Sequence, residues 1–276
     1  MTWTEFHAVL TGPASYQGYA LLLTFGAMIA YQELFPARDW PRIAHWRLQA
    51  LAFNACLFAI YILIPSEVAA SPLGGWSLFG LASWGLWAAP LGILLLSFAE
   101  YWFHRAEHRF AWMWRSMHQI HHYPQRVDVW GTALGHPLEM AVQALISTTV
   151  MVWVLGLDPL AAGLAGYCLT VLGLFQHMNI ETPRWLGYIV SRPDAHFLHH
   201  ERGVHARNYS ELPFWDMLFG TYENPERFTG DVGFAQRGET RLGEMLAFVD
   251  IEAPDTGPMG AMTALATAEC RDRSTN

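Results

Sequence analysis

Eight of the thirteen histidines of this chain lie in three short clusters. The clusters have the spacings HxxxH, HxxHH and HxxHH, and their members are His104, His108, His118, His121, His122, His196, His199 and His200. On a helix, offsets of three and four residues place the imidazoles of one cluster on one face. Eight imidazole ligands are too many for one zinc ion, which takes four. The pattern therefore predicts a site for two metal ions with five or six ligands each.

Three further polar residues lie near the ends of apolar segments. His177 is predicted as a ninth ligand, although a single histidine at such an end is often a polar cap. We expect Asn179 either to hold a metal-bound water or to orient His177. His136 is either a tenth ligand or a support for a ligand. The isolated His7, His45 and His205 are not expected to bind metal.

Metal-bound imidazole usually donates its other N–H group to a carboxylate or a carbonyl. Glu100, Glu139, Asp194 and Asp216 are candidate acceptors, and Asp194 is also a candidate N-cap for the helix that carries the third cluster. We interpret Glu107 instead as an ordinary solvated or helix-capping acid.

Imidazole ligands suit zinc, copper, iron and nickel, and the number of ligands argues against a structural zinc. A histidine-rich pair of irons at a membrane surface is suited to O2 activation, because two irons together supply electrons to cleave the O–O bond. The resulting oxidant can remove hydrogen from an unactivated C–H bond of a membrane-dissolved substrate. The sequence thus predicts two iron ions with O2 as co-substrate.

Long uncharged segments must position these clusters. Only 14% of the 276 residues are charged, against about 25% in soluble domains. A membrane-spanning helix needs about 20 apolar residues, and five segments meet this need: 17–35, 48–65, 84–103, 138–155 and 159–177. We expect 71–83 to be interfacial or re-entrant, 156–158 to be a tight turn, and a further turn between the first two clusters. The prediction is an all-α polytopic membrane protein with about five transmembrane helices.

The distribution of arginine indicates an orientation. The chain has no lysine, and with five spans all 16 arginines fall on one side, together with the three histidine clusters. Cationic residues are held in the cytoplasm, so we expect an integral membrane protein with a cytoplasmic helical cap and the N-terminus on the far side. The net charge of −8 gives no nucleic-acid signal. The three cysteines predict neither a disulfide framework nor a thiolate site.

The same patterns divide the chain into three parts. Residues 1–83 would hold the N-terminal transmembrane helices and the interfacial segment, and 84–225 would form the catalytic domain. Residues 226–276 would form a C-terminal extension, disordered after about residue 253 because the composition changes to Ala, Thr, Gly, Pro and charge.

The three clusters resemble the histidine boxes of the fatty acid hydroxylase and sterol desaturase superfamily. Matching segments are Gly135–Glu139, Gln176–Asn179, Asn208–Ser210 and Phe214–Tyr222, so the resemblance covers about residues 90–225. The HxxxH first cluster differs from the HxxxxH form that is common among acyl-lipid desaturases. The resemblance implies a membrane di-iron oxygenase that uses O2 and two electrons. It implies as metal ligands His104, His108, His118, His121, His122, His177, His196, His199 and His200.

Such enzymes usually receive electrons from a partner, and this sequence has no haem or flavin motif. We therefore expect a separate donor: a cytochrome b5-like protein, a ferredoxin or a reductase. Two interpretations of the arginine-rich face stay open: the arginines dock an acidic donor, or they only set the membrane topology. The arginines concerned are Arg105, Arg109, Arg115, Arg126, Arg202 and Arg207.

The predicted reaction is hydroxylation or desaturation of a lipid C–H bond, and a sterol-type or alkyl lipid is favoured as the substrate. The two reactions differ in how the substrate is placed, which one sequence does not show. Two alternatives come from other classes. A membrane zinc hydrolase would need a carboxylate base beside one metal, and HExxH is absent. A non-catalytic metal-binding or metal-transport protein would need more polar residues inside the spans.

Overall fold

The computed structural model describes residues 13–204, 206–235 and 238–252, and this part of the chain is helical. It contains no strand apart from one isolated antiparallel bridge between Glu201 and Val232. The helices are α2 Pro13–Leu34, α3 Trp46–Ala70, η1 Leu81–Ala88, α4 Ala89–Arg109, α5 Ala111–Met113, η2 Trp114–His118, α6 Gln119–His122, η3 Val129–Ala133, α7 Pro137–Thr148, η4 Thr149–Val154, α8 Pro159–His177, η5 Arg184–Tyr188, α9 Pro193–His199, α10 Pro213–Phe219, η6 Gly238–Thr240 and α11 Leu242–Leu246.

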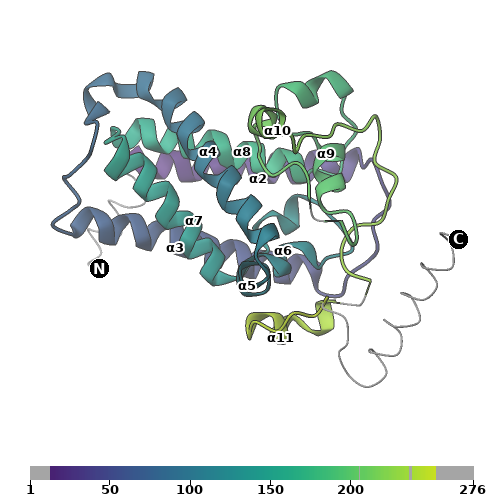
Figure 1. Cartoon of the computed structure of the whole chain (residues 1–276). Helices are drawn as coiled ribbons and strands as arrows, with labels where there is room; N and C mark the ends of the chain where they lie inside the picture. Colours follow the sequence, from purple (N-terminus) through teal and green to yellow (C-terminus); the bar gives the residue numbers. More distant parts are fainter. Residues whose placement is uncertain (1–12, 205, 236–237, 253–276) are drawn as a thin grey trace, which may run out of the picture.

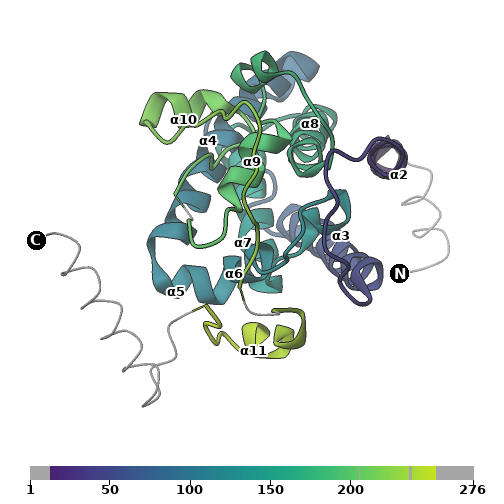
Figure 2. The same cartoon turned by 90° about the vertical axis from the view of Figure 1, so that its right-hand side faces the viewer.

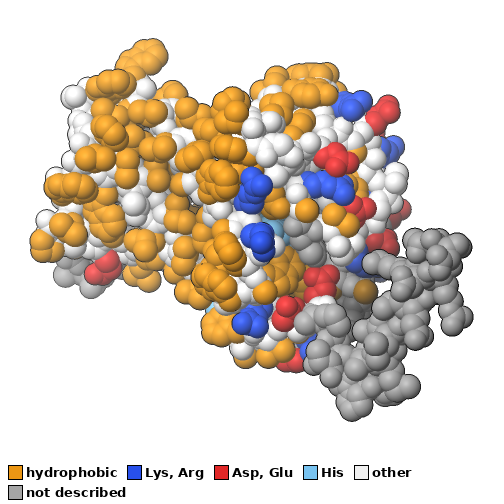
Figure 3. Space-filling model, in the orientation of Figure 1, with side chains coloured by type: hydrophobic (Ala, Val, Ile, Leu, Met, Phe, Trp, Pro, Cys, Tyr) orange, Lys and Arg blue, Asp and Glu red, His pale blue; other side chains and the backbone are white. Residues whose placement is uncertain are grey.

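The long helices form one part of the molecule, and the short helices gather at one end of it (Figure 1). Figure 2 looks onto this end, where α5, α6, α9 and α10 lie over the ends of the long helices. Apolar side chains cover most of the surface around the long helices, whereas charged side chains gather around the short ones (Figure 3). We call the end with the short helices the cap.

Four helical stretches are long and apolar enough to cross a membrane: Trp46–Ala70, Leu81–Arg109, Pro137–Val154 and Pro159–His177. At most 33% of the most apolar window of each is buried inside the molecule, so the rest of its apolar surface is available to lipid. These stretches match four of the five predicted spans. The segment 17–35 forms α2, which is not among the four. The five-span count, the cytoplasmic orientation and the division into three parts stay predictions.

The connections between helices at the end opposite the cap contain several glycines and prolines. Among the described residues 71–80 no helix forms, and the backbone N–H groups of Leu78 and Phe79 donate to the carbonyls of Trp153 and Val154 at 2.8 and 3.0 Å. Gly156 has a φ of 60°, and a Cβ there would lie 2.3 Å from Ser77 Oγ. The tight turn predicted at 156–158 is therefore confirmed, and it requires glycine.

Small side chains bring α4 close to both η4 and α8. Ala89, Ala161 and Ala165 are buried in the core that these helices share. A Cβ on Gly92 would lie only 3.0–3.2 Å from Leu157, Met151 and Ala165, so the helices approach closely at this point. The cap ends of α4 and α8 carry His104, His108 and His177, and the packing holds these ends together.

The chain reverses direction between the first and second histidine clusters. Helix α4 continues through His108 to Arg109, and Phe110 then adopts an extended conformation with φ −110° and ψ 114°. Helix α5, the π-helical turn η2 and α6 follow, and η2 ends at His118. Such widened turns are frequent at functional sites. The predicted reversal is confirmed, and it turns the second cluster back towards the first.

Candidate metal centre

The structure collects all nine predicted ligands into two groups. The first group is His104, His108, His118, His122 and His199, and the second is His121, His177, His196 and His200. Within each group, one ring nitrogen of every histidine lies within 4.8 Å of the others. The second and third clusters each contribute to both groups: the two histidines four residues apart share one group, and the third histidine of the cluster joins the other. Each group therefore draws on three separate parts of the chain.

Hydrogen bonds on the outer side of the rings fix which nitrogen faces inward. In the first group, His104 Nδ1 donates to the carbonyl of Tyr209 at 2.6 Å, and His118 Nδ1 donates to Glu139 Oε1 at 2.9 Å. In the second group, His121 Nδ1 donates to the Leu134 carbonyl at 3.0 Å and His177 Nδ1 to the Gly173 carbonyl at 2.7 Å. A neutral imidazole that donates through Nδ1 keeps a lone pair on Nε2.

These Nε2 atoms face one another at short distance. His104 Nε2 lies 2.9 Å from His118 Nε2, and His121 Nε2 lies 3.2 Å from His177 Nε2. Two lone pairs this close repel unless a cation lies between them. Metal–nitrogen distances of about 2.0–2.1 Å place neighbouring ligand nitrogens about 2.9–3.4 Å apart at octahedral to tetrahedral angles. The spacing of the rings thus fits metal ligation.

Burial keeps the rings of the cap neutral. Desolvation, followed by the neighbouring His118, lowers the pKa of His121 to about 4. Desolvation also lowers the pKa of His196, His199 and His200. His199 is fully buried and donates through Nδ1 to the Arg207 carbonyl at 2.6 Å, which leaves its buried Nε2 without a hydrogen-bond partner. A metal ion would satisfy this atom.

The two groups adjoin each other. The rings of His122, from the first group, and His200, from the second, are stacked with their centroids 4.3 Å apart. His118 and His121 have centroids 5.1 Å apart across the same boundary. The arrangement is therefore one buried centre with two places for a metal, and the nine donors divide five to four.

Two buried carboxylates flank His118. Glu139 is 4% exposed and accepts the hydrogen bond from His118 Nδ1, and Glu107 Oε2 lies 3.5 Å from the same nitrogen. Gly135 makes room for Glu139, because a Cβ there would lie 2.8 Å from Glu139 Oε2. Our interpretation of Glu107 as a solvated or capping acid was wrong, since its side chain is fully buried. Its offset of three residues from His104 placed it on the same helix face and was the signal to use.

Asp216 supports the centre through a loop. It is 1% exposed and accepts hydrogen bonds from the backbone N–H groups of Tyr209 and Ser210 at 2.8 and 2.9 Å. Tyr209 in turn offers its carbonyl to His104. Asn208, with a φ of 53°, fixes the start of the same loop by donating to the Ala195 and Glu223 carbonyls at 2.9 and 2.8 Å. Asp216 therefore orients His104 indirectly, through the backbone of Tyr209.

Four other candidates, His136, Asp194, Asn179 and Glu100, lie outside both histidine groups. His136 caps α7: its Nδ1 accepts from Leu138 N at 3.0 Å, so the structure gives it a structural role. Asp194 accepts from Arg192 Nη1 at 2.8 Å and from Phe228 N at 2.9 Å. The N-cap of α9 is Arg192, and Asp194 lies in the first turn, so the N-cap assignment was wrong.

Asn179 forms no hydrogen bond to His177 in the described part of the chain. Its Nδ2 donates to the Arg38 carbonyl at 2.8 Å, and its backbone N–H donates to Gln32 Oε1 at 3.3 Å. Glu100 forms no hydrogen bond to a histidine within the described part of the chain. His45 lies exposed before α3, and His7, His205 and the predicted disordered tail lie outside the described residues.

Comparison with known proteins finds a family match for the region that carries this geometry. Residues 89–221 match the model of the fatty acid hydroxylase family. A curated relative, the ornithine lipid hydroxylase OlsE of Rhizobium tropici, is 28% identical over 219 residues, which is 75% of this chain. The match spans 65% of that relative, just under two thirds of its length. No solved structure matches the chain. Residues 89–221 therefore match a fatty acid hydroxylase domain, and both findings support the superfamily that the three histidine clusters resemble.

Proposed function

We propose that the chain is a membrane enzyme that hydroxylates a C–H bond of a lipid, with O2 as oxidant and two iron ions held by the nine histidines. One observation carries the proposal: the Nε2 lone pairs of nine buried or half-buried histidines converge in two adjoining groups within the region that matches the fatty acid hydroxylase family. The irons would supply the oxidising chemistry. The histidines would hold them through Nε2, and Glu139 and the backbone carbonyls would orient the rings.

The overall reaction balances with an external donor. A lipid C–H bond, O2, two electrons and two protons give the hydroxylated lipid and one water. One oxygen atom enters the lipid and the other leaves as water, so the carbon is oxidised while O2 is reduced. The family description and the name of the relative favour hydroxylation over desaturation. Beside the sterol-type and alkyl lipids expected from the sequence, the name of that relative adds aminolipids of the ornithine type as substrate candidates.

A lipid profile of a deletion strain tests this function. We expect one hydroxylated lipid class to disappear and to return when the wild-type gene is restored. The variant His121→Ala removes a ligand of the second group and should not restore it. His45→Asn is the matched control, because asparagine tolerates the left-handed backbone at position 45 (φ 57°).

Metal analysis of the purified proteins completes the test. Wild type and His45→Asn from iron-replete cells should each carry close to two metal ions per chain, and His121→Ala should carry fewer. An unchanged lipid profile in the deletion strain would refute the substrate class. Equal metal content in all three proteins would refute the ligand assignment.

We further propose a separate acidic electron donor. Three of the six arginines considered from the sequence form ion pairs within the chain, since Arg126 pairs with Asp128, Arg202 with Asp231, and Arg207 with Glu223. Within the described residues the other three, Arg105, Arg109 and Arg115, form no ion pair with an acidic side chain. They lie on α4 and η2, next to His104, His108 and His118, which makes this side of the cap the favoured docking surface.

A further inference from the structure

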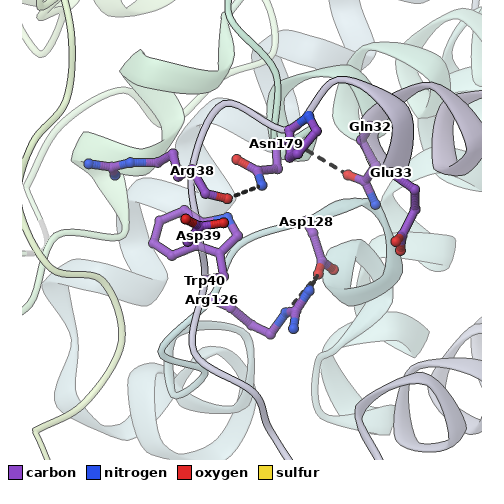
Figure 4. A pocket seen from close by; sticks show the side chains of 9 residues that line it. Gln32, Glu33, Arg38, Asp39, Trp40, Arg126, Asp128 and Asn179 are labelled. Atoms are coloured by element: carbon purple, nitrogen blue, oxygen red, sulfur yellow. Dashed lines mark hydrogen bonds and ion pairs between the residues drawn. The ribbon is translucent and has the colours of Figure 1, made fainter.

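A polar cavity of about 170 Å³ lies beside the second histidine group. Its walls come from the end of α2, the α2–α3 connection, residues 126–128 and Asn179, which follows α8 (Figure 4). A much smaller cavity, about 10 Å³, shares Arg126 and Asp128 with it and is lined by His121, His177 and His200. A group bound in the larger cavity would thus sit next to the predicted metal ligands.

The walls of this cavity are held in place by buried hydrogen bonds. Asp128, 1% exposed, accepts from Trp46 Nε1 at 3.1 Å and from Arg126 Nε at 2.7 Å. Gln32, 4% exposed, accepts from Val129 N at 3.1 Å through its Oε1 and also holds the backbone of Asn179. A site built in this way does not need to rearrange when a ligand binds.

Three lining side chains keep buried polar atoms without a partner: Asn179, Trp40 and Arg38, whose Nη1 donates to no acceptor. Asn179 is 7% exposed, and its buried Oδ1 accepts no hydrogen bond, although its Nδ2 is satisfied. The buried Trp40 Nε1 donates to no acceptor. Unsatisfied buried polar groups are rare in native proteins because each costs folding free energy. One free acceptor and two free donors, one of them a guanidinium nitrogen, indicate a ligand that offers both a donor and an acceptor.

The charges around the cavity narrow the class of ligand. Glu33, Asp39 and Asp128 provide three carboxylates, whereas Arg38 and Arg126 provide two guanidinium groups. Arg126 already pairs with Asp128, whereas Arg38 Nη2 donates to the Phe228 carbonyl at 2.7 Å and its Nη1 has no partner. A phosphate dianion would face an excess of carboxylate, and an acyl chain or a sterol ring would leave these groups unsatisfied.

The geometry points to this cavity as the binding site for a zwitterionic lipid headgroup that carries both an ammonium and a carboxylate. The ammonium would bind Asn179 Oδ1 and the exposed carboxylate of Asp39, and the carboxylate would accept from Trp40 Nε1. The inference rests on the proposed function, since it takes the ligand to be the lipid substrate. It would place that headgroup beside His121, His177 and His200.

Binding to the metal-loaded protein in detergent, without a reductant, tests the inference separately from turnover. The probe is N-palmitoyl-lysine, whose headgroup carries a free carboxylate and an ammonium. Its methyl ester lacks the carboxylate, its Nε-acetyl derivative lacks the ammonium, and free lysine lacks the chain. We expect the zwitterionic lipid to bind about tenfold more tightly than either derivative. Free lysine binding as tightly as the lipid would assign the cavity to a soluble amino acid and overturn the headgroup.

Two variants locate the site. Asp39→Asn and Trp40→Phe each remove one proposed contact, and each should weaken N-palmitoyl-lysine binding about tenfold. Asp39→Asn should leave binding of the Nε-acetyl derivative unchanged, and Trp40→Phe should leave binding of the methyl ester unchanged. Glu67→Gln, an exposed acid at the far end of α3, is the matched control.

The outcomes separate the two proposals. Equal binding of all the probe lipids, or wild-type affinity in both variants with melting temperatures unchanged, would overturn the headgroup site even if a lipid is hydroxylated. Selective binding in a protein that hydroxylates no lipid would uphold the headgroup site and overturn the proposed function.

Discussion

His118 links the first histidine group to the two carboxylates that flank it. Its Nε2 lies 2.9 Å from His104 Nε2 and 3.1 Å from His122 Nε2, while its Nδ1 lies between the carboxylates of Glu139 and Glu107. A carboxylate that accepts from the outer nitrogen fixes the tautomer and makes the inner nitrogen a stronger ligand. The first histidine group therefore depends on groups that bind no metal themselves.

Substitution of Glu139 tests this dependence. Glu139→Gln keeps the size of the side chain and removes its charge, and we expect metal affinity at the first group to fall about 10–100-fold. Gly135→Ala should lower the same affinity, because the added Cβ would lie 2.8 Å from Glu139 Oε2 and displace the carboxylate. Metal remaining per chain after a timed challenge with a chelator measures both effects.

Glu181→Gln is the control for that experiment, because Glu181 is an exposed residue paired with Arg227. We expect it to retain metal as the wild type does. Loss of both metal ions in parallel from Glu139→Gln would contradict a role confined to the first group, and full retention would contradict any orienting role.

At the level of elements, the start of α10 controls a loop that reaches the centre. Asp216, in the first turn of this helix, accepts from Tyr209 N, Ser210 N and Thr221 Oγ1. Burial raises the pKa of Asp216, and its hydrogen bonds act in the opposite direction. Each hydrogen bond to a buried charged group contributes about 1.5–3 kcal/mol.

Asp216→Asn should therefore weaken both the fold and the first histidine group. The amide places a donor against a backbone N–H, so we expect the free energy of unfolding to fall by about 2–3 kcal/mol. Thermal unfolding in detergent, together with metal analysis, measures the two effects. Asp231→Asn removes an exposed partner of Arg202 and should cost less than about 1 kcal/mol. Equal melting temperatures for the two variants would show that the 208–210 loop does not depend on Asp216.

At the level of the whole molecule, apolar and charged surfaces separate along its length. Apolar side chains cover the long helices, and the arginines and acids gather on the cap (Figure 3). If the long helices lie in a bilayer, the proposed soluble electron donor would approach the centre through the cap, where Arg109 and Arg115 are exposed.

The double variant Arg109→Glu, Arg115→Glu tests the docking surface. We expect reduction by an acidic donor to slow by tenfold or more, and the dependence of the rate on ionic strength to weaken. Stopped-flow reduction at several salt concentrations measures this. Arg42→Glu, which reverses one charge in the α2–α3 connection, is the control for charge reversal elsewhere on the chain. A variant with wild-type rates, salt dependence and metal content would leave the arginines with a topological role alone.

The sequence determined the local features of this protein. Helical spacing put the histidines of each cluster on one face, apolar length predicted four helices that the structure confirms as long enough to cross a membrane, and Gly156 predicted the turn before α8. These helix faces, helix lengths and turns depend on residues close to one another in the chain, and the periodicity of the sequence therefore predicts them.

The tertiary structure alone decided how the clusters combine. The division of the nine histidines into groups of five and four depends on the reversal at Phe110 and on the packing of α4 against α8. The buried place of Glu107, the capping role of His136 and the support from Asp216 also arise from contacts between segments far apart in sequence. Residue type and spacing identify the side chains that can bind a metal, but only the packing of the chain brings their lone pairs together in two groups.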